Sequence, residues 1–159
     1  SLSPDDKKLV YKTGGLGKEV DIKLIDLVTK KETKTSWEKA EIGNTSSAFV
    51  WSPDGQKVLF MSSNSILRST STADNPQKLA YLDTKDSKVT ELLTITKTYL
   101  NSISYYSWLD NNTVIYQQAT ASKENDFGNS EKEVYKLDLP TKKYSKIDNT
   151  AQLEEVLFW

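Results

Sequence analysis

Short apolar runs alternate with polar, turn-forming segments along the whole chain. Runs such as Ala48–Trp51, Lys57–Met61 and Val89–Leu93 are rich in β-branched and aromatic residues, and clusters of Ser, Thr, Asn, Asp, Lys and Gly separate them. Runs of this length, bounded by turn residues, are typical of β-strands. The pattern therefore predicts an all-β chain built from short antiparallel strands.

A repeated motif orders these strands. Ser3–Tyr11 aligns with Ser52–Phe60, and Trp108–Tyr116 is a degenerate third copy. Each copy is followed by a second block that ends near an aspartate, and a turn rich in Lys and Thr comes next. These blocks are Leu24–Leu27, Tyr81–Thr84 and Lys136–Leu139, with the shared aspartates Asp26, Asp83 and Asp138. Two blocks in the same order, three times over, indicate an internal repeat.

Each repeat predicts four strands. The first runs into a tryptophan (Trp51, Trp108 and Trp159), and a Ser-Pro-Asp-Gly turn leads to the second. The third ends at the shared aspartate, and the Lys/Thr turn leads to a fourth, such as Tyr144–Ile147. Four-stranded units of about 40–50 residues are the signature of β-propeller blades. We expect one partial β-propeller of about three four-stranded antiparallel blades, at about 1–47, 48–102 and 103–153, with 154–159 as the first strand of a next or partner blade.

Three blades are too few for a filled ring, since propellers usually carry about 4–8. Two explanations stay open. The chain is a fragment of a longer propeller, or it is a half-ring that pairs with a second copy. In the second case a homodimer would complete a six-bladed ring, with Val156–Trp159 completing the first blade of the partner.

The segment Ser52–Phe60 resembles the repeat of TolB-type (WD-like) propellers, and it is similar to the propellers of prolyl-oligopeptidase-type peptidases and of the tricorn protease. The second copy alone keeps the full motif, because Leu2 stands where the tryptophan is expected and Asp6 replaces the glycine. The resemblance implies the fold and an extracytoplasmic, exported protein. It does not imply one function, because the same repeat serves unrelated proteins.

Composition excludes several kinds of chemistry. The chain has no cysteine and no histidine, which excludes disulfides, a Ser-His-Asp triad and the usual zinc ligand sets. Its 21 basic and 22 acidic residues give no electrostatic pull toward nucleic acid, and Arg68 is the only arginine. No apolar stretch approaches the length of a membrane span. We therefore expect no catalytic residues, no metal, no cofactor, no nucleic-acid partner and no membrane insertion.

The candidate binding residues lie in connections on one propeller face. Arg68 lies in the predicted loop Met61–Lys78, and Phe127 in the predicted loop Ala119–Lys132. Trp37 and Tyr99 lie in connections to the next first strand. Exposed aromatic or basic side chains on loops of a rigid scaffold can hold a protein, peptide or glycan. The structural alternative is that these aromatic residues cover the edge of the core.

The repeated residues favour structural roles. Tryptophans at a repeated position are expected to pack in the core, and the repeated aspartates to cap turns through backbone N–H groups. The first functional hypothesis is a non-catalytic binding or scaffold module. The alternative is the accessory propeller of a peptidase whose catalytic domain lies outside this chain. A propeller hydrolase with a central metal ranks last, because Glu154 and Glu155 occur in one copy alone.

Overall fold

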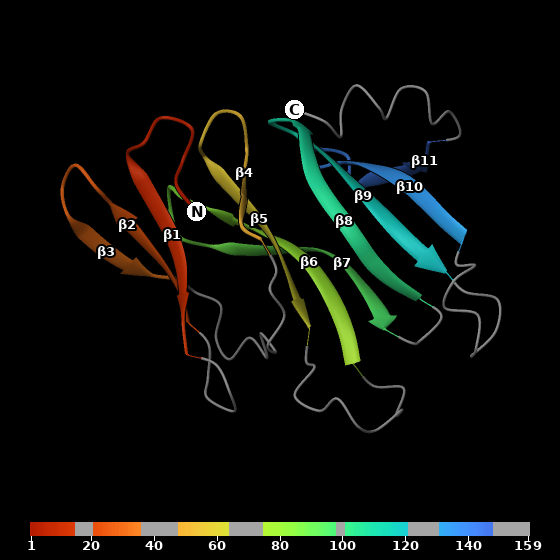
Figure 1. The fold of residues 1–159 in the computed structure, drawn as a ribbon. Helices are drawn as coiled ribbons and strands as arrows, with labels where there is room; N and C mark the ends of the chain where they lie inside the picture. Colours follow the sequence, from red (N-terminus) through yellow and green to blue (C-terminus); the bar gives the residue numbers. More distant parts are fainter. Residues whose placement is uncertain (15–20, 36–47, 64–74, 98–100, 121–130, 148–159) are drawn as a thin grey trace. The chain divides into compact units, whose positions relative to one another are not determined.

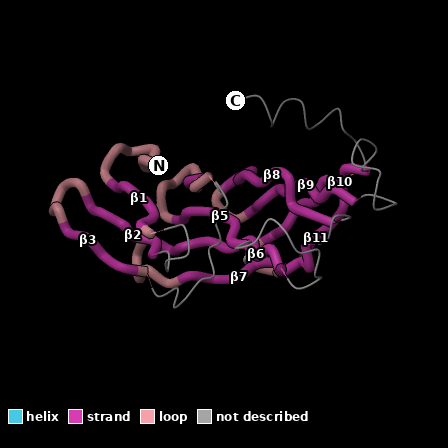
Figure 2. Tube along the Cα trace, turned by 60° about the horizontal axis from the view of Figure 1, so that its bottom comes forward, coloured by secondary structure: helices cyan, strands magenta, loops and turns pink. Residues whose placement is uncertain are grey.

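The computed structural model describes residues 1–14, 21–35, 48–63, 75–97, 101–120 and 131–147. All regular structure in these ranges is β-strand, and Figure 2 shows strands and loops alone. The chain divides into two compact units, Ser1–Lys97 and Thr98–Trp159. The prediction of an all-β chain is confirmed.

The strands form three antiparallel sheets in which neighbours in sequence are neighbours in space (Figure 1). The first sheet contains β1 (Lys8–Thr13), β2 (Asp21–Asp26) and β3 (Lys31–Lys34). The second contains β4 (Val50–Trp51), β5 (Lys57–Ser63), β6 (Asn75–Asp83) and β7 (Val89–Lys97). The third contains β8 (Asn101–Asp110), β9 (Thr113–Thr120), β10 (Glu131–Asp138) and β11 (Lys143–Lys146). The three sheets follow one another along the chain.

Several strands are longer than the apolar runs predict. β5 continues to Ser63 and β6 begins at Asn75, so the connection predicted over Met61–Lys78 shortens to 64–74. In the same way the connection predicted over Ala119–Lys132 shortens to 121–130. Backbone hydrogen bonds hold an antiparallel ladder whatever the side chains are. Because the strand ends carry polar residues, the apolar pattern of the sequence predicts strands that are too short.

The first sheet begins with a short equivalent of the strand that precedes β5. Leu2 forms a bridge with Leu9, the Ser1 amino group donates to the Val10 carbonyl at 2.8 Å, and the Val10 N–H donates to the Ser1 carbonyl at 3.0 Å. This arrangement matches the pairing of Trp51 with Val58 in the second sheet. Leu2 thus takes the position of the tryptophan. The strand predicted at 154–159 lies outside the described residues.

Side chains alternate between two faces of each sheet, and residues paired across strands share a face. We define the front face of each sheet as the face that carries Leu9 in the first sheet, Val58 in the second and Val114 in the third. The opposite face of each sheet is its back face. The front faces carry Leu9, Tyr11 and Ile25 in the first sheet, Val58, Phe60, Ala80 and Leu82 in the second, and Val114, Tyr116 and Leu137 in the third. The back faces carry Val10, Ile22 and Leu24, then Leu59, Leu79 and Tyr81, then Ile115, Gln117 and Val134.

The back face of the first sheet and the front face of the second share one hydrophobic core. This core contains Val10, Ile22, Leu24, Val58, Phe60, Ala80 and Leu82, and Phe49, Trp51 and Val89 pack against it. The burial of apolar area between the two sheets stabilises the first compact unit. Trp51 packs at this core and Trp108 is 7% exposed, which confirms the structural interpretation for both tryptophans. Trp159 lies outside the described residues.

The Ser-Pro-Asp-Gly turn requires a left-handed residue at its fourth position. Gly55 has φ of 65°, and Asp6, at the same position in the first sheet, has φ of 58°. We expect Gly55→Ala to lower the free energy of unfolding by about 1–2 kcal/mol, because a Cβ atom disfavours this conformation. Urea unfolding measures the change. Asp6→Gly is the matched control and should not destabilise the protein; a neutral Gly55→Ala would mean that the turn does not need positive φ.

Candidate functional site

The carboxylates of the Ser-Pro-Asp turns accept hydrogen bonds from groups of the same turn. In the second sheet the Ser52 hydroxyl donates to Asp54 Oδ1 at 2.7 Å, and the Gln56 N–H donates to the same oxygen at 3.0 Å. The Lys57 N–H donates to Ser52 Oγ at 2.9 Å. Burial raises the pKa of Asp54, but the hydrogen bonds from Ser52 and Gln56 outweigh it, so the pKa lies below its usual value. Asp54 therefore holds the turn together as an ionised acceptor.

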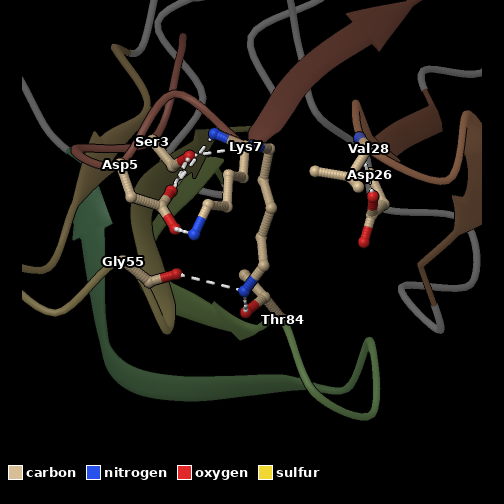
Figure 3. Close-up of polar contacts among 8 residues, drawn as sticks. Ser3, Asp5, Lys7, Asp26, Val28, Gly55 and Thr84 are labelled. Carbon is tan, nitrogen blue, oxygen red and sulfur yellow. Dashed lines mark hydrogen bonds and ion pairs between the residues drawn. The ribbon is translucent and has the colours of Figure 1, made fainter.

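The first turn repeats this geometry (Figure 3). The Ser3 hydroxyl donates to Asp5 Oδ1 at 2.8 Å, and the Lys7 N–H donates to that oxygen at 3.2 Å. The hydrogen bond from Ser3, followed by that from Lys7, lowers the pKa of Asp5. The turns of the first and second sheets therefore have the same hydrogen bonds. The prediction that these aspartates are turn residues is confirmed.

The shared aspartates at the end of the third strand cap the next turn. Asp26 Oδ1 accepts the N–H groups of Val28 and Thr29 at 2.9 and 2.8 Å. Asp83 Oδ1 accepts the Lys85 N–H at 2.8 Å, and Asp138 Oδ1 accepts the Thr141 N–H at 2.9 Å. The Thr29 N–H is the main cause that lowers the pKa of Asp26. These carboxylates are structural caps, as the sequence predicts.

A lysine joins the turns of the first two sheets. Lys8 Nζ donates to Thr84 Oγ1 at 2.8 Å and to the Gly55 carbonyl at 3.4 Å, and Figure 3 shows Gly55 and Thr84 side by side at this junction. A Cβ built on Gly55 would lie 3.5 Å from Pro4 Cδ. The Ser-Pro-Asp turns of the two sheets are therefore in contact. We call the edge of each sheet that carries these turns the turn edge.

The opposite edge carries the longer connections. Within each antiparallel sheet, the segments 14–20, 35–49, 64–74 and 121–130 all leave from the edge opposite the turns. The turns themselves span only residues such as 53–56, 84–88 and 111–112. We call this second edge the loop edge. Since the turn edges of the first two sheets are adjacent, their loop edges lie on a common side of the first unit.

The four predicted site residues belong to the loop edge by topology. Trp37 lies between β3 and β4, Arg68 between β5 and β6, Tyr99 between β7 and β8, and Phe127 between β9 and β10. All four lie outside the described residues. Their role in binding stays a prediction.

The third sheet contains a hollow that sequence reasoning missed. A cavity of 240 Å³ is lined by Tyr105, Ile115, Tyr116, Gln117 and Val134. The Tyr105 side chain is 38% exposed, whereas Ile115 is 1% exposed. By cross-strand register Tyr105, Gln117 and Val134 share the back face. A tyrosine at a bulge gives no periodic signal, so the alternation of the sequence did not reveal it.

The described ranges hold no group of three or more acidic, histidine or cysteine side chains arranged to bind a metal ion. In the same ranges no helix has the length and apolar character needed to cross a bilayer. Burial of the Tyr116 hydroxyl, followed by the neighbouring Tyr135 and Tyr144, raises the pKa of Tyr116 to about 12. Tyr116 is therefore a neutral core side chain, stacked on Tyr135 with ring centroids 5.3 Å apart.

Comparisons with protein-family profiles and with curated proteins give no match. Solved structures do match. The chain is similar to the AtxE2 isopeptidase, with a TM-score of 0.68 and 13% identity over 97% of this chain and 29% of that one. It is similar to the β-propeller domain of the Trilobed protease from Pyrococcus furiosus, with a TM-score of 0.60 and 17% identity over 93% and 41% of the two chains. TolB from Acinetobacter baumannii gives a TM-score of 0.51 and 15% identity over 91% and 30%.

This chain has the fold of β-propeller blades. The three sheets are its blades, and the predicted resemblance to TolB-type and peptidase propellers is confirmed at the level of the fold. The propeller chain spans less than half of the length of each matched structure described above. Identities below a fifth carry no information on substrates or partners.

Proposed function

We propose that this chain is a non-catalytic binding or scaffold module that holds a protein, peptide or glycan at its loop edge, outside the cytoplasm. The chain has no cysteine, and its fold is similar to that of TolB, both of which support an exported protein. The residues proposed to contact the ligand are Trp37, Arg68, Tyr99 and Phe127.

The asymmetry between the two edges carries this proposal. The turn edge consists of short turns whose carboxylates already accept hydrogen bonds within the turn. Asp54 accepts one from Ser52, and Asp26 accepts one from Thr29. The loop edge of the second sheet carries the connection 64–74, and the loop edge of the third sheet carries the connection 121–130. A rigid scaffold with variable loops on one edge is the usual arrangement of a binding module.

The charged side chains of the described strands also favour binding over hydrolysis. Glu32, Glu91 and Glu133 are paired with Lys23, Lys78 and Lys146 at 2.7, 3.1 and 2.8 Å. Paired-acid hydrolysis needs two carboxyl groups that flank one substrate bond. Carboxylates committed to turns and ion pairs support a structural role instead.

A direct test uses the purified chain on a peptide array and on a glycan array. We expect saturable binding to one array, and Trp37→Ala with Phe127→Ala to weaken it at least about tenfold, which corresponds to about 1.4 kcal/mol. The unfolding midpoint should not change. Tyr144→Ala is the matched control, because Tyr144 is 69% exposed and lies at the start of β11, beside the turn edge. Unchanged binding by the double variant would remove both aromatic residues from the site.

The second candidate is the accessory propeller of a peptidase. Its support is the set of matched structures, which includes the AtxE2 isopeptidase, the tricorn protease and an acylaminoacyl peptidase. The discriminating observation is the coding sequence that follows Trp159 in the parent gene. A Gly-x-Ser-x-Gly motif followed by Asp and His would favour the peptidase, and its absence would favour the binding module.

A further inference from the structure

The last strand of each sheet has an outer side, away from its neighbour, and the three outer sides differ. Among the described strands β3 pairs with β2 alone, β7 with β6 alone and β11 with β10 alone. β3 and β11 are four residues long, and each has a lysine at both ends. β7 is nine residues long, and its only charged residues are Glu91 and Lys97. Short edge strands and lysines protect a sheet from further pairing, so β7 is the least protected of the three.

The backbone of β7 points alternately toward β6 and toward its outer side. The Asp83 N–H donates to the Lys88 carbonyl at 2.9 Å, so the backbone of Asp83 points toward β7. Gln77 lies an even number of residues before Asp83 on β6, which pairs with β5 in one register between them, so its backbone points the same way. Gln77 pairs with Ile95. The backbone groups of Ile95 therefore bond to β6, and those of Thr94 point outward.

The outer side of β7 is regular from Leu93 to Lys97. Leu92 is the extra residue of a β-bulge, because no residue of β6 pairs with it. Beyond the bulge, every residue from Leu93 to Lys97 pairs with β6 in one register. The alternation therefore directs the N–H and C=O groups of both Thr94 and Thr96 outward. Backbone groups that point outward in a row are the groups that an added strand binds.

The side chains beside this outer side are apolar on one face of the sheet and polar on the other. Leu93 and Ile95 lie on the back face, and both are partly exposed. Thr94 is exposed on the front face, where its hydroxyl donates to Glu91, and Glu91 pairs with Lys78 at 3.1 Å. A strand added here therefore needs apolar residues on the back face, beside Leu93 and Ile95.

β7 is itself a strand with these properties. Two antiparallel copies of β7, related by a two-fold axis at Ile95, pair Ile95 with itself and Thr94 with Thr96 of the other copy. The outward backbone groups of the two threonines then bond reciprocally on both sides of the axis. The two Ile95 residues form a non-hydrogen-bonded pair, the closer kind of cross-strand pair, in which two β-branched side chains pack against each other.

We propose that β7 is a dimerisation strand, which pairs antiparallel with β7 of a second copy of this chain about a two-fold axis at Ile95. The second sheets of the two copies then form one continuous sheet. The contact is isologous, because the same residues serve both copies. It uses the second sheet alone, so it does not depend on what the loop edge binds.

A single cysteine tests the register, because the chain has no cysteine of its own. In the proposed dimer the two Cα atoms of Ile95 are about 4.5 Å apart, which is within the range of a disulfide. Ile95→Cys should form a covalent dimer on mild oxidation at least about ten times faster than Tyr144→Cys, because the dimer holds the two thiols at high effective concentration. Tyr144 is 69% exposed and controls for random collisions. Leu93→Cys, which does not face itself across the axis, should also react slowly.

A proline tests the backbone contact. Thr94→Pro removes an outward N–H and leaves the bonds to β6 in place, so the fold should survive. In sedimentation equilibrium we expect the unaltered chain to associate reversibly toward twice its 18.0 kDa. Thr94→Pro should weaken this association at least about tenfold, because the two-fold axis removes two bonds at once. Tyr144→Pro, at an outward-pointing position of β11, is the matched control and should associate normally.

Three results would each overturn the proposal. They are a chain that stays monomeric at millimolar concentration, Ile95→Cys that oxidises no faster than Tyr144→Cys, and a Thr94→Pro variant that is folded but associates normally. Circular dichroism confirms folding. If Thr94→Pro unfolds, Ile95→Lys takes its place, because it puts two like charges at the axis and should also weaken association.

Discussion

Phe60→Ala should lower the free energy of unfolding by about 3–5 kcal/mol, the loss expected when a buried aromatic side chain is truncated. Phe60 is 1% exposed and belongs to the core shared by the first two sheets. Its ring also meets Phe49 edge-on, with centroids 6.0 Å apart. Truncation removes this contact and leaves a cavity between two rigid sheets that cannot close around it. Urea unfolding followed by circular dichroism measures the loss.

The control for this prediction is another aromatic residue on a strand. Tyr144 is 69% exposed on β11, so Tyr144→Ala should change the free energy of unfolding by no more than about 0.5 kcal/mol. A loss below about 1 kcal/mol for Phe60→Ala would contradict the shared core. It would mean that the first sheet does not cover the front face of the second.

Ser52→Ala should lower the free energy of unfolding by about 1–3 kcal/mol, although the substitution removes a single oxygen atom. Ser52 is completely buried, and its hydroxyl accepts the Lys57 N–H at 2.9 Å and donates to Asp54 at 2.7 Å. Alanine leaves that backbone N–H without its hydroxyl acceptor and removes a hydrogen bond that favours the ionised Asp54. Loss of hydrogen bonds by buried groups is costly because water cannot replace the lost partner.

A surface serine separates this effect from the general cost of substitution. Ser145 lies on β11 with an exposed side chain, and Ser145→Ala should be nearly neutral. Ser3→Ala should match Ser52→Ala, because Ser3 is 2% exposed and makes the same bonds to Asp5 and Lys8. If Ser52→Ala were as mild as Ser145→Ala, the turn would be held by its backbone alone.

The repeat was readable from sequence because its signal is local. The hydrogen bonds of Ser52 and Asp54 that shape the turn are made with Gln56 and Lys57, and Gly55 supplies the positive φ. The first and last residues of the strands were harder to predict from the sequence. Ser62 is 4% exposed and pairs with Lys78 inside the ladder, but neither residue has the apolar character that marks a strand. Backbone pairing, which any residue can make, decided where β5 and β6 begin and end.

The candidate sites also differ in how far the sequence predicts them. The predicted residues Trp37, Arg68, Tyr99 and Phe127 follow from topology, since connections between the same strands of each blade leave from one edge. The hollow beside Tyr105 did not follow from any pattern. It depends on a register shift between Ile103 and Tyr105 and on side chains from β8, β9 and β10 that converge on one face.

The sequence by itself determined the all-β class, the three repeats and the turn chemistry of each aspartate, because these depend on neighbours within a few residues. The tertiary structure alone decided which faces are filled. Val10 and Phe60 are far apart in sequence yet share a core, whereas Leu2, at the position of Trp51, is 47% exposed. Equivalent residues of a repeat have the same pattern, but their burial depends on whether another sheet packs against them.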